Sequence, residues 1–360
     1  MAGVLSGVRV IELAGLGPAP FCCMLLADMG ADVIRVERPG GAKQLKSTDV
    51  LARGRRVIEL DLKVDSGKQA LRALIHRADV LIEGYRPGVM ERLGFGPEVC
   101  QADNPKLVFA RMTGWGQQGP LAQRAGHDIN YIAITGALNA IGPADGPPSI
   151  PLNLIGDFGG GGMMLATGVL AAVIHARSSG QGQVVDAAMT DGTALLTSMM
   201  WGFMQSGLWK NSRGENFLDG AAHFYTTYEC ADGKHLSVGA IEPQFYDALL
   251  KGCGLAAEDF PGHYRDEITW QPSKEKLAAV FKQKTRDAWC DWFEGQDACV
   301  APVLDWQEAL AHPHNVARET FVVLDGVTQP APAPRFERTP SEARPFHVDV
   351  DVDSVLKDWS

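Results

Sequence analysis

Short apolar runs alternate with helix-periodic segments through the first half of the chain, the pattern of a parallel sheet covered by helices. The runs that predict strands are 8–13, 32–36, 56–60, 80–82 and 107–112, and the segments that predict helices are 18–29, 66–77 and 158–177. The sequence therefore predicts an α/β fold with a Rossmann-like, doubly wound parallel sheet.

The pattern changes after residue 186. Residues 187–208 form a long apolar run containing four methionines, which predicts one helix linking two domains. Two apolar runs flanking the turn Ala231-Asp232-Gly233-Lys234 then predict an antiparallel hairpin, with amphipathic helices after it. We expect a large domain over 1–186, a linker helix over 187–219, a small α+β domain over 220–300 and a return segment over 301–360.

Composition narrows the class of protein. Hydrophobic residues make up 46% and charged residues 21%, as in ordinary soluble proteins, and the net charge of −10 argues against general affinity for nucleic acids or anionic membranes. The longest nearly apolar run, 163–174, is too short to span a bilayer, so we expect no membrane insertion. The first residues lack the basic region of a signal peptide. Seven cysteines without any Cys-x-x-Cys spacing predict free thiols in a cytoplasmic protein.

Two segments carry candidate acid/base groups: Gly-His-Asp-Ile-Asn-Tyr at 126–131, and Asn-Leu-Ile-Gly-Asp-Phe at 153–158 running into four glycines. His127 and Asp157 are each expected near a helix start. An imidazole and a carboxylate facing one another across a pocket can remove a proton from one face of a carbon and return it to the other. Backbone N–H groups at the start of the glycine-rich helix would hold negative charge on a neighbouring oxygen.

Plainer interpretations of these residues stay open at this point. His127 is as well explained by a structural histidine, and Asp157 by a helix N-cap. Asp128 is expected to be the N-cap of its helix. Glu242 is expected at the end of a strand, where a surface acid is the ordinary interpretation, and the methionines of 189–204 are more often core than ligand pocket.

A nicotinamide site is disfavoured because the third glycine of the Gly15-x-Gly17 motif is replaced by Pro20. A phosphorylated ligand such as coenzyme A is a better candidate, because arginine forks suit phosphate oxygens. Seven cations lie between residues 35 and 56, more than the acids of the same stretch, and Arg86 is expected near them. The alternative to a phosphate-binding site is a solvated loop of charged residues. These seven cations are Arg35, Arg38, Lys43, Lys46, Arg53, Arg55 and Arg56. We expect no metal, since the one close histidine pair, His312 and His314, has no companion ligands.

Eight stretches of the chain together resemble the 2-methylacyl-CoA racemase branch of the class III CoA-transferase superfamily, and the resemblance covers essentially the whole chain. The Arg-Pro-Gly-Val run is shared across the superfamily, whereas Gly-His-Asp-Ile-Asn-Tyr is close to racemase-specific. The stretches are 10–15, 30–39, 86–94, 126–131, 151–160, 180–186, 238–246 and 297–303.

The resemblance implies a racemase that interconverts (R)- and (S)-2-methylacyl-CoA through an enolate, with His127 and Asp157 as the two bases. It implies that Glu242 assists His127, that Asn153 orients the Asp157 carboxylate, and that the backbone N–H of Asp157 holds the thioester oxygen. The alternative is a CoA-transferase in which Asp157 is the nucleophile.

The same resemblance implies an interlocked homodimer acting in lipid metabolism, with CoA as part of the substrate and no separate cofactor. Further site residues follow from it, and one departure accompanies them: His223 stands where relatives have proline, in a segment expected near the pocket mouth. The implied CoA-binding residues are Arg38, Leu60, Asp61, Leu62 and Arg86, and the implied acyl-pocket residues are Met189, Met199 and Tyr225.

Overall fold

The computed structural model describes residues 3–348 and 350–360 and divides the chain into two compact units. The first unit comprises Met1–Thr135, Pro151–Thr197 and Pro313–Ser360, and the second comprises Gly136–Ile150 and Ser198–His312.

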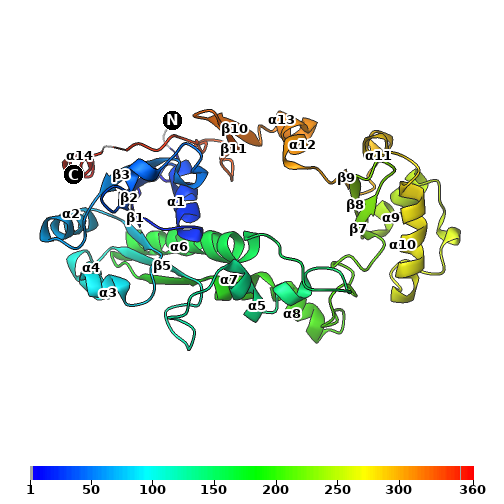
Figure 1. The fold of residues 1–360 in the computed structure, drawn as a ribbon, viewed down its shortest axis with the longest axis horizontal. Helices are drawn as coiled ribbons and strands as arrows, with labels where there is room; N and C mark the ends of the chain where they lie inside the picture. The colour runs from blue at the N-terminus through cyan, green and yellow to red at the C-terminus, as the bar shows by residue number, and fades with distance from the viewer. Residues whose placement is uncertain (1–2, 349) are drawn as a thin grey trace. The chain divides into compact units, whose positions relative to one another are not determined.

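A six-stranded parallel sheet is the centre of the first unit, with strand order β3-β2-β1-β4-β5-β6. This is the order expected of a doubly wound sheet, so the predicted α/β class is confirmed. Figure 1 labels β1, β2, β3 and β5 of this sheet. The strands are β1 (Arg9–Leu13), β2 (Asp32–Glu37), β3 (Arg55–Glu59), β4 (Val80–Glu83), β5 (Val108–Thr113) and β6 (Val184–Ala188).

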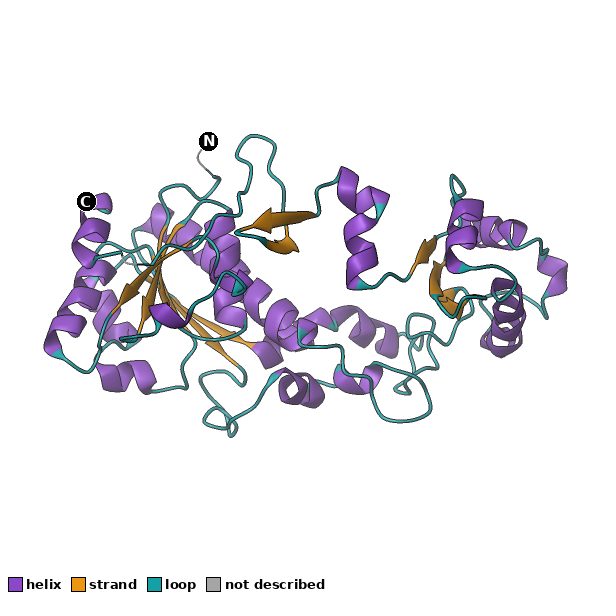
Figure 2. Cartoon of the chain, turned by 45° about the horizontal axis from the view of Figure 1, so that its top comes forward, coloured by secondary structure: helices purple, strands orange, loops and turns teal. Residues whose placement is uncertain are grey.

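Both faces of the sheet are buried at its central strands, β1, β4 and β5, which explains why these strands are continuous or nearly continuous apolar runs. Val10 packs on one face, against α1 (Pro18–Asp28) and α6 (Met164–Ser179), whereas its neighbour Ile11 packs on the other face, against α2 (Asp65–Ile75). Figure 2 shows the strands in orange between the helices in purple. Further elements of this unit are α3 (Val89–Leu93), α4 (Pro97–Asp103), α5 (Asp128–Ile134), α7 (Met189–Leu196), α13 (Pro313–Ala317), the hairpin β10 (Phe321–Leu324) and β11 (Val327–Pro330), α14 (Val352–Asp358), and the 3₁₀ turns η1 (Ala42–Gln44) and η2 (Val50–Ala52).

A π-helix, η4 (Leu154–Met163), precedes α6, so the predicted helix over 158–177 begins earlier and in a wider coil than expected. Together they form a helix over Leu154–Ser179 that is long and apolar enough to cross a membrane by length and composition alone. Within its most apolar stretch, 44% is buried inside the protein. A core helix of a soluble protein passes the same test, and α6 indeed buries Leu165, Val169 and Val173 against the sheet core.

The second unit contains a three-stranded antiparallel sheet of β7 (Tyr225–Glu229), β8 (His235–Gly239) and β9 (Val300–Pro302). The predicted hairpin is confirmed, with Glu229 opposite His235 across the turn. Its core is rich in aromatic side chains, among them Phe224, Tyr246 and Trp270. The helices of this unit are α8 (Ser198–Gln205), α9 (Pro243–Gly252), α10 (Glu267–Phe281), α11 (Arg286–Phe293) and α12 (Trp306–Ala311), with 3₁₀ turns η3 (Leu138–Ala140) and η5 (Ala257–Asp259).

The structure differs from the expected single linker helix over 187–208. Residues 187 and 188 finish strand β6, and the helical remainder breaks at Thr197 into α7 and α8, which belong to different units. Apolar composition does not reveal such a break. The chain returns to the first unit at Pro313. Near its end, Trp359 packs in the sheet core and donates a hydrogen bond from Nε1 to Asp32 Oδ2 at 2.7 Å.

Candidate active site

Two cavities adjoin at the carboxyl ends of the central strands, where the strand order reverses between β1 and β4. Open α/β sheets bind their ligands in this crevice. The two cavities share Gly15 and Leu16, from the turn after β1, and Tyr85, from the turn after β4. A ligand that spans both would lie across the middle of the sheet edge.

The smaller cavity, of about 310 Å³, is lined by His127 together with Arg86, Trp115, Tyr131 and Met189. Tyr131 Oη donates to the carbonyl oxygen of Gly126, and its ring meets that of Trp115 edge to face at 4.7 Å. Burial, with the Asp157 charge nearby, raises the pKa of Tyr131. Tyr131 and Trp115 are therefore wall residues that sequence reasoning missed, although Tyr131 ends the Gly-His-Asp-Ile-Asn-Tyr motif.

His127 is the N-cap of α5, which corrects the expectation that Asp128 would cap that helix. His127 has extended backbone, with φ −134° and ψ 175°, and its N–H donates to Asn130 Oδ1 at 3.0 Å. This bond fixes the entry of the chain into the helix. The imidazole consequently stands at the start of α5, facing the smaller cavity.

Asp157 lies in the first turn of η4 rather than at its N-cap, so the capping interpretation of this residue is wrong. Asn153 Nδ2 donates to Asp157 Oδ2 at 2.9 Å, and a Cβ on Gly17 would lie only 3.5 Å from that same oxygen. The carboxylate therefore stands beside the turn that follows β1, and this turn lines both cavities.

The segments of the two candidate bases are joined by Asp128, the neighbour of His127. Asp128 Oδ2 accepts the backbone N–H of Asp157 at 2.7 Å, and Asp128 is only 4% exposed. Burial raises the pKa of Asp128, and the Asp157 charge adds to this effect. The N–H of Asp157, expected to be free for a thioester oxygen, is thus already engaged by a carboxylate.

The four glycines after Asp157 permit close packing of η4. A Cβ on Gly160 would lie 2.6 Å from the backbone nitrogen of Thr193 in α7, and one on Gly162 would lie 2.6 Å from Phe21 Cδ1 in α1. Any side chain would force the neighbouring backbone to move. The glycine run allows η4 to pack against α7 and α1, and the expected anion binding by its N–H groups stays a prediction.

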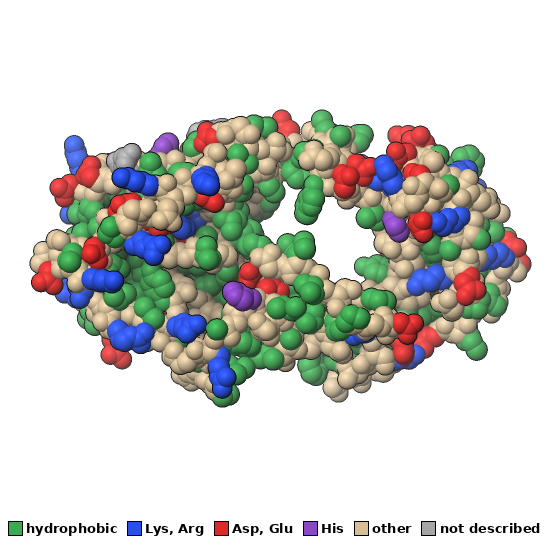
Figure 3. Space-filling model, viewed as in Figure 1, with side chains coloured by type: hydrophobic (Ala, Val, Ile, Leu, Met, Phe, Trp, Pro, Cys, Tyr) green, Lys and Arg blue, Asp and Glu red, His purple; other side chains and the backbone are tan. Residues whose placement is uncertain are grey.

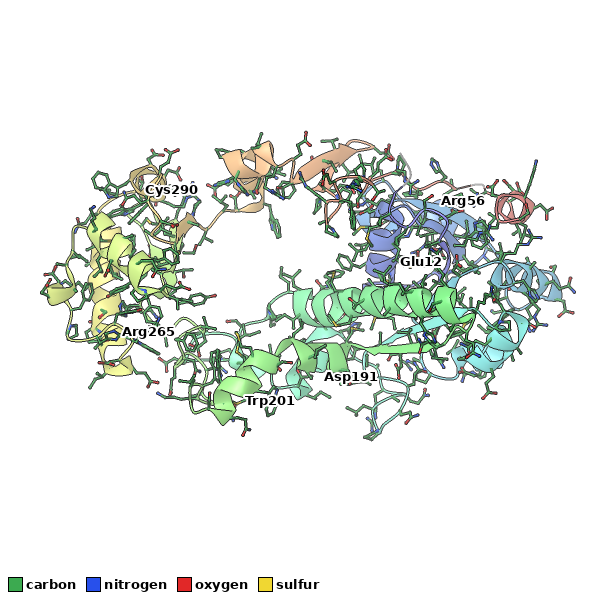
Figure 4. The ribbon with its side chains drawn as sticks, turned by 180° about the vertical axis from the view of Figure 1, so that it is seen from behind. Glu12, Arg56, Asp191, Trp201, Arg265 and Cys290 are labelled. Carbon is green, nitrogen blue, oxygen red and sulfur yellow. The ribbon has the colours of Figure 1, made fainter. Side chains whose placement is uncertain are left out.

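Four of the seven cations between residues 35 and 56 pair with carboxylates of the first unit, so the predicted excess of positive charge is smaller than the sequence suggests. Two of the four, Arg35 and Arg55, share the buried carboxylate of Glu12, at 2.8 and 2.9 Å. Figure 4 labels Glu12 within this part of the fold. Arg55 also donates to the carbonyl oxygen of Pro20 in α1.

The other two cations, Arg53 and Arg56, form three further pairs, one of them with an acid near the end of the chain. Arg53 binds Asp28 at 2.5 Å, and Arg56, also labelled in Figure 4, binds Asp32 and Asp358 at 2.6 Å each. The remaining three cations are exposed and make no salt bridge within the described part of the chain. They are Arg38, Lys43 and Lys46.

Of the predicted CoA-binding residues, Arg38 lines the larger cavity, of about 790 Å³, and Arg86 lines the smaller one. Leu60, Asp61 and Leu62 line neither, and the Leu60 side chain packs in the sheet core. On the face shown in Figure 3, Lys and Arg side chains in blue reach the surface of the first unit alongside hydrophobic side chains in green.

The turn that carries Tyr85 and Arg86 is held by Glu83, a residue that sequence reasoning missed. Glu83 Oε2 accepts the Tyr85 N–H at 2.7 Å and Oε1 accepts Arg111 Nε at 2.9 Å. Burial raises the pKa of Glu83. The sequence of β4 did not predict that Glu83, the last residue of this short apolar strand, would be buried and paired with Arg111.

The predicted acyl-pocket residues fall in both units. Met189 lines the smaller cavity of the first unit, whereas Tyr225 lines a cavity of about 980 Å³ in the second unit and Met199 is exposed on α8. Glu242 also belongs to the second unit, where it is the exposed N-cap of α9. Its suggested assistance to His127 stays a prediction.

His223 does not line the cavity of about 980 Å³ itself, although Gly220, Ala221 and Tyr225 of the same segment do. It is fully buried in the aromatic core of the second unit, its Nε2 lies 2.9 Å from Tyr246 Oη, and its ring stacks on Phe260. Burial lowers the pKa of His223 to about 4, helped by the charge of Lys274. The departure from proline therefore places a histidine in the core of this unit, and its effect on substrate preference stays a prediction.

The chain is similar in sequence to proteins of known family. The model of CoA-transferase family III matches residues 5–347. The chain is 52% identical to alpha-methylacyl-CoA racemase of Mus musculus over 340 residues, covering 94% of this chain and 88% of that protein. It is 48% identical to alpha-methylacyl-CoA racemase of Homo sapiens over 338 residues, covering 94% and 87%.

A solved structure shares the fold: a CAIB/BAIF family protein from Brucella suis, with a TM-score of 0.82, 23% identity and complete coverage of both chains. The resemblance noted from the sequence motifs is confirmed, and the chain is a homologue of alpha-methylacyl-CoA racemase at about half identity.

Proposed function

This chain belongs to CoA-transferase family III, and we propose that it interconverts (R)- and (S)-2-methylacyl-CoA by 1,1-proton transfer through an enolate. His127 and Asp157 are the two bases. The observation that supports the proposal is the hydrogen bond by which Asp128, the residue after His127, accepts the backbone N–H of Asp157 within the first unit. The identity to two racemases supports the same reaction.

Inversion at a carbon acidified by a carbonyl needs one base on each face. One base removes the proton, the electron pair moves onto the thioester oxygen, and the conjugate acid of the other base returns a proton to the opposite face. In the reverse direction the bases exchange roles. Asn153 holds Asp157 Oδ2 at 2.9 Å, which leaves the other carboxylate oxygen for the proton.

The CoA portion is proposed to lie along the two adjoining cavities. Arg38, exposed in the larger cavity, would meet the phosphate oxygens, and the thioester would reach His127 in the smaller one past Tyr85. Met112 and Met189 in the smaller cavity supply flexible apolar surface suited to branched acyl chains.

Three further parts of the proposal are expectations from the sequence, the first two of them from the family resemblance. The chain would act as a homodimer in which Glu242 of one copy assists His127 of the other. The acyl pocket would include Tyr225 and Met199 of the second unit. The enzyme would work in the cytoplasm, on CoA thioesters, without a metal or separate cofactor.

The competing function is acyl-CoA transfer, in which Asp157 would attack the thioester carbonyl and form an acyl-aspartyl intermediate. The family whose model matches this chain is named for CoA transfer, so this function is the alternative to test. A transferase needs no second base beside the acidic carbon, so His127 distinguishes the two reactions.

The test is to incubate each enantiomer of a 2-methylacyl-CoA with the protein in D₂O and to follow C2 by NMR. We expect both enantiomers to interconvert with deuterium entering at C2. His127→Ala and Asp157→Asn should each lose inversion by about 10²–10⁴-fold while keeping exchange of one enantiomer, a different one in each variant. His175→Ala, which removes an exposed histidine of α6, should match the parent. Acyl transfer to a free acid faster than C2 exchange would favour the transferase.

A further inference from the structure

Asp128 occupies the contact between the two segments that carry the proposed bases. It is the first residue of α5, directly after His127, and its side chain reaches the beginning of η4. The approach is close enough to require glycine opposite: a Cβ on Gly156 would lie 2.6 Å from Asp128 Oδ2.

The two carboxylate oxygens of Asp128 are in different situations. Oδ2 accepts the N–H of Asp157, whereas Oδ1 is buried without a hydrogen bond among the described residues, although the backbone N–H of Gly156 lies near the carboxylate and favours its charged form. An unpartnered buried carboxylate oxygen costs stability.

Inversion at C2 requires a more exact arrangement of the two bases than proton exchange with retention does. Exchange with retention needs a single base aligned with C2, but inversion needs both bases aligned with the same carbon. His127 and Asp157 lie on separate elements, so their mutual position depends on contacts between α5 and η4. The bond from Asp157 N to Asp128 Oδ2 links the backbone of one base to the immediate neighbour of the other.

Resting on the proposed racemase function, we propose that Asp128 is a positioning residue that sets His127 and Asp157 in register for inversion. Asp128 itself takes no proton from the substrate. Its carboxylate fixes the peptide of Asp157 relative to the start of α5, and this sets the distance between the two bases.

The experiment compares two rates for each variant in D₂O, starting from a single enantiomer: inversion at C2, and deuterium incorporation with retention. Asp128→Ala should lower inversion about 10²-fold, the effect of a misplacement near 1 Å, and lower retentive exchange much less. Asp128→Asn keeps an acceptor for the Asp157 N–H, so its ratio of inversion to retention should stay near that of the parent.

Asp79→Ala is the matched control. Asp79 Oδ2 also accepts a backbone N–H, that of Arg9 at 2.8 Å, but at the amino ends of the strands, the sheet edge opposite the cavities. It should leave the ratio of inversion to retention unchanged. If Asp128→Ala lowers both rates equally, or if Asp128→Asn loses inversion as severely as Asp128→Ala, the positioning role is wrong.

A second measurement does not depend on turnover. Amide hydrogen exchange at Asp157 should be at least about ten-fold faster in Asp128→Ala than in the parent and unchanged in Asp79→Ala, because a lost hydrogen bond opens that N–H to solvent. Unchanged protection would overturn the inference even for an active enzyme. Absence of all C2 exchange in the parent would instead overturn the proposed function, and the amide measurement would still decide whether Asp128 holds Asp157.

Discussion

Acid should destabilise this protein in part through His223. The side chain is fully buried, and burial lowers its pKa to about 4 from the ordinary 6.5. Its Nδ1 has no hydrogen-bond partner among the described residues, so a second ring proton would have nowhere to donate. The folded state therefore favours the neutral ring, whereas the unfolded chain can protonate it freely.

The sign and size of the change in unfolding free energy with pH follow from the difference in the pKa of His223 between the folded and unfolded states. Well above pH 6.5, at about pH 7.5 and higher, neither state binds the extra proton and the contribution to stability is close to nil. As the pH falls from 6.5 towards 4 the unfolded state binds it first, so stability is lost. With a pKa of about 4 in the folded protein, the loss is about 2 kcal/mol at pH 5 and roughly 3 kcal/mol below pH 4.

The assay is chemical denaturation of the parent and of His223→Gln between pH 4.5 and 7.5, monitored by tryptophan fluorescence. Glutamine can still bond to Tyr246 but does not titrate, so the stability difference between the two proteins should shift by about 2 kcal/mol in the variant's favour from pH 7.5 to pH 5. His235→Gln, at an exposed histidine of the same unit, is the control and should track the parent. Parallel curves for parent and His223→Gln would refute the reasoning.

Two further predictions concern the first unit. Arg38→Ala should weaken binding of a CoA thioester by about ten-fold or more, as loss of an arginine–phosphate contact does, without altering turnover at saturation. Lys46→Ala, an exposed cation outside the cavity, should bind as the parent in the same titration calorimetry; equal affinity of the Arg38 variant would remove Arg38 from the site. Gly160→Ala should cost about 1–3 kcal/mol in denaturation, because its Cβ would press on the backbone of Thr193. Gly202→Ala in α8, with nothing within 4 Å, should not destabilise, and equal stability of both variants would contradict the close-packing argument.

The parallel sheet could be predicted from the sequence because burial on both faces makes its central strands continuous or nearly continuous apolar runs. The helices after β1 and β3 followed from the same alternation, as did the hairpin of the second unit from its turn residues. The break at Thr197 could not be predicted, since α7 and α8 are both apolar and the division into units depends on contacts between distant segments.

The candidate bases could be predicted, but their surroundings could not. The arginines near residue 55 read as a positive patch because their partners, such as Glu12 and Asp358, lie far away in the chain. The glycines after Asp157 read as an anion-binding turn, whereas their function depends on how closely α7 approaches. The local sequence shows which charged and polar groups are present. Contacts between distant segments determine which of these groups are already paired within the protein.

This distinction bears most directly on the two bases. The segment between α5 and η4, Gly136–Ile150, belongs to the second unit, so covalent connection does little to hold the bases in register. The register has to come from contacts within the first unit. They include the glycine-permitted packing of η4 on α7 and the bond from Asp157 to Asp128. The first positions the whole π-helix, while the second acts at the reacting residue itself, and this is why inversion should respond to Asp128 more sharply than folding does.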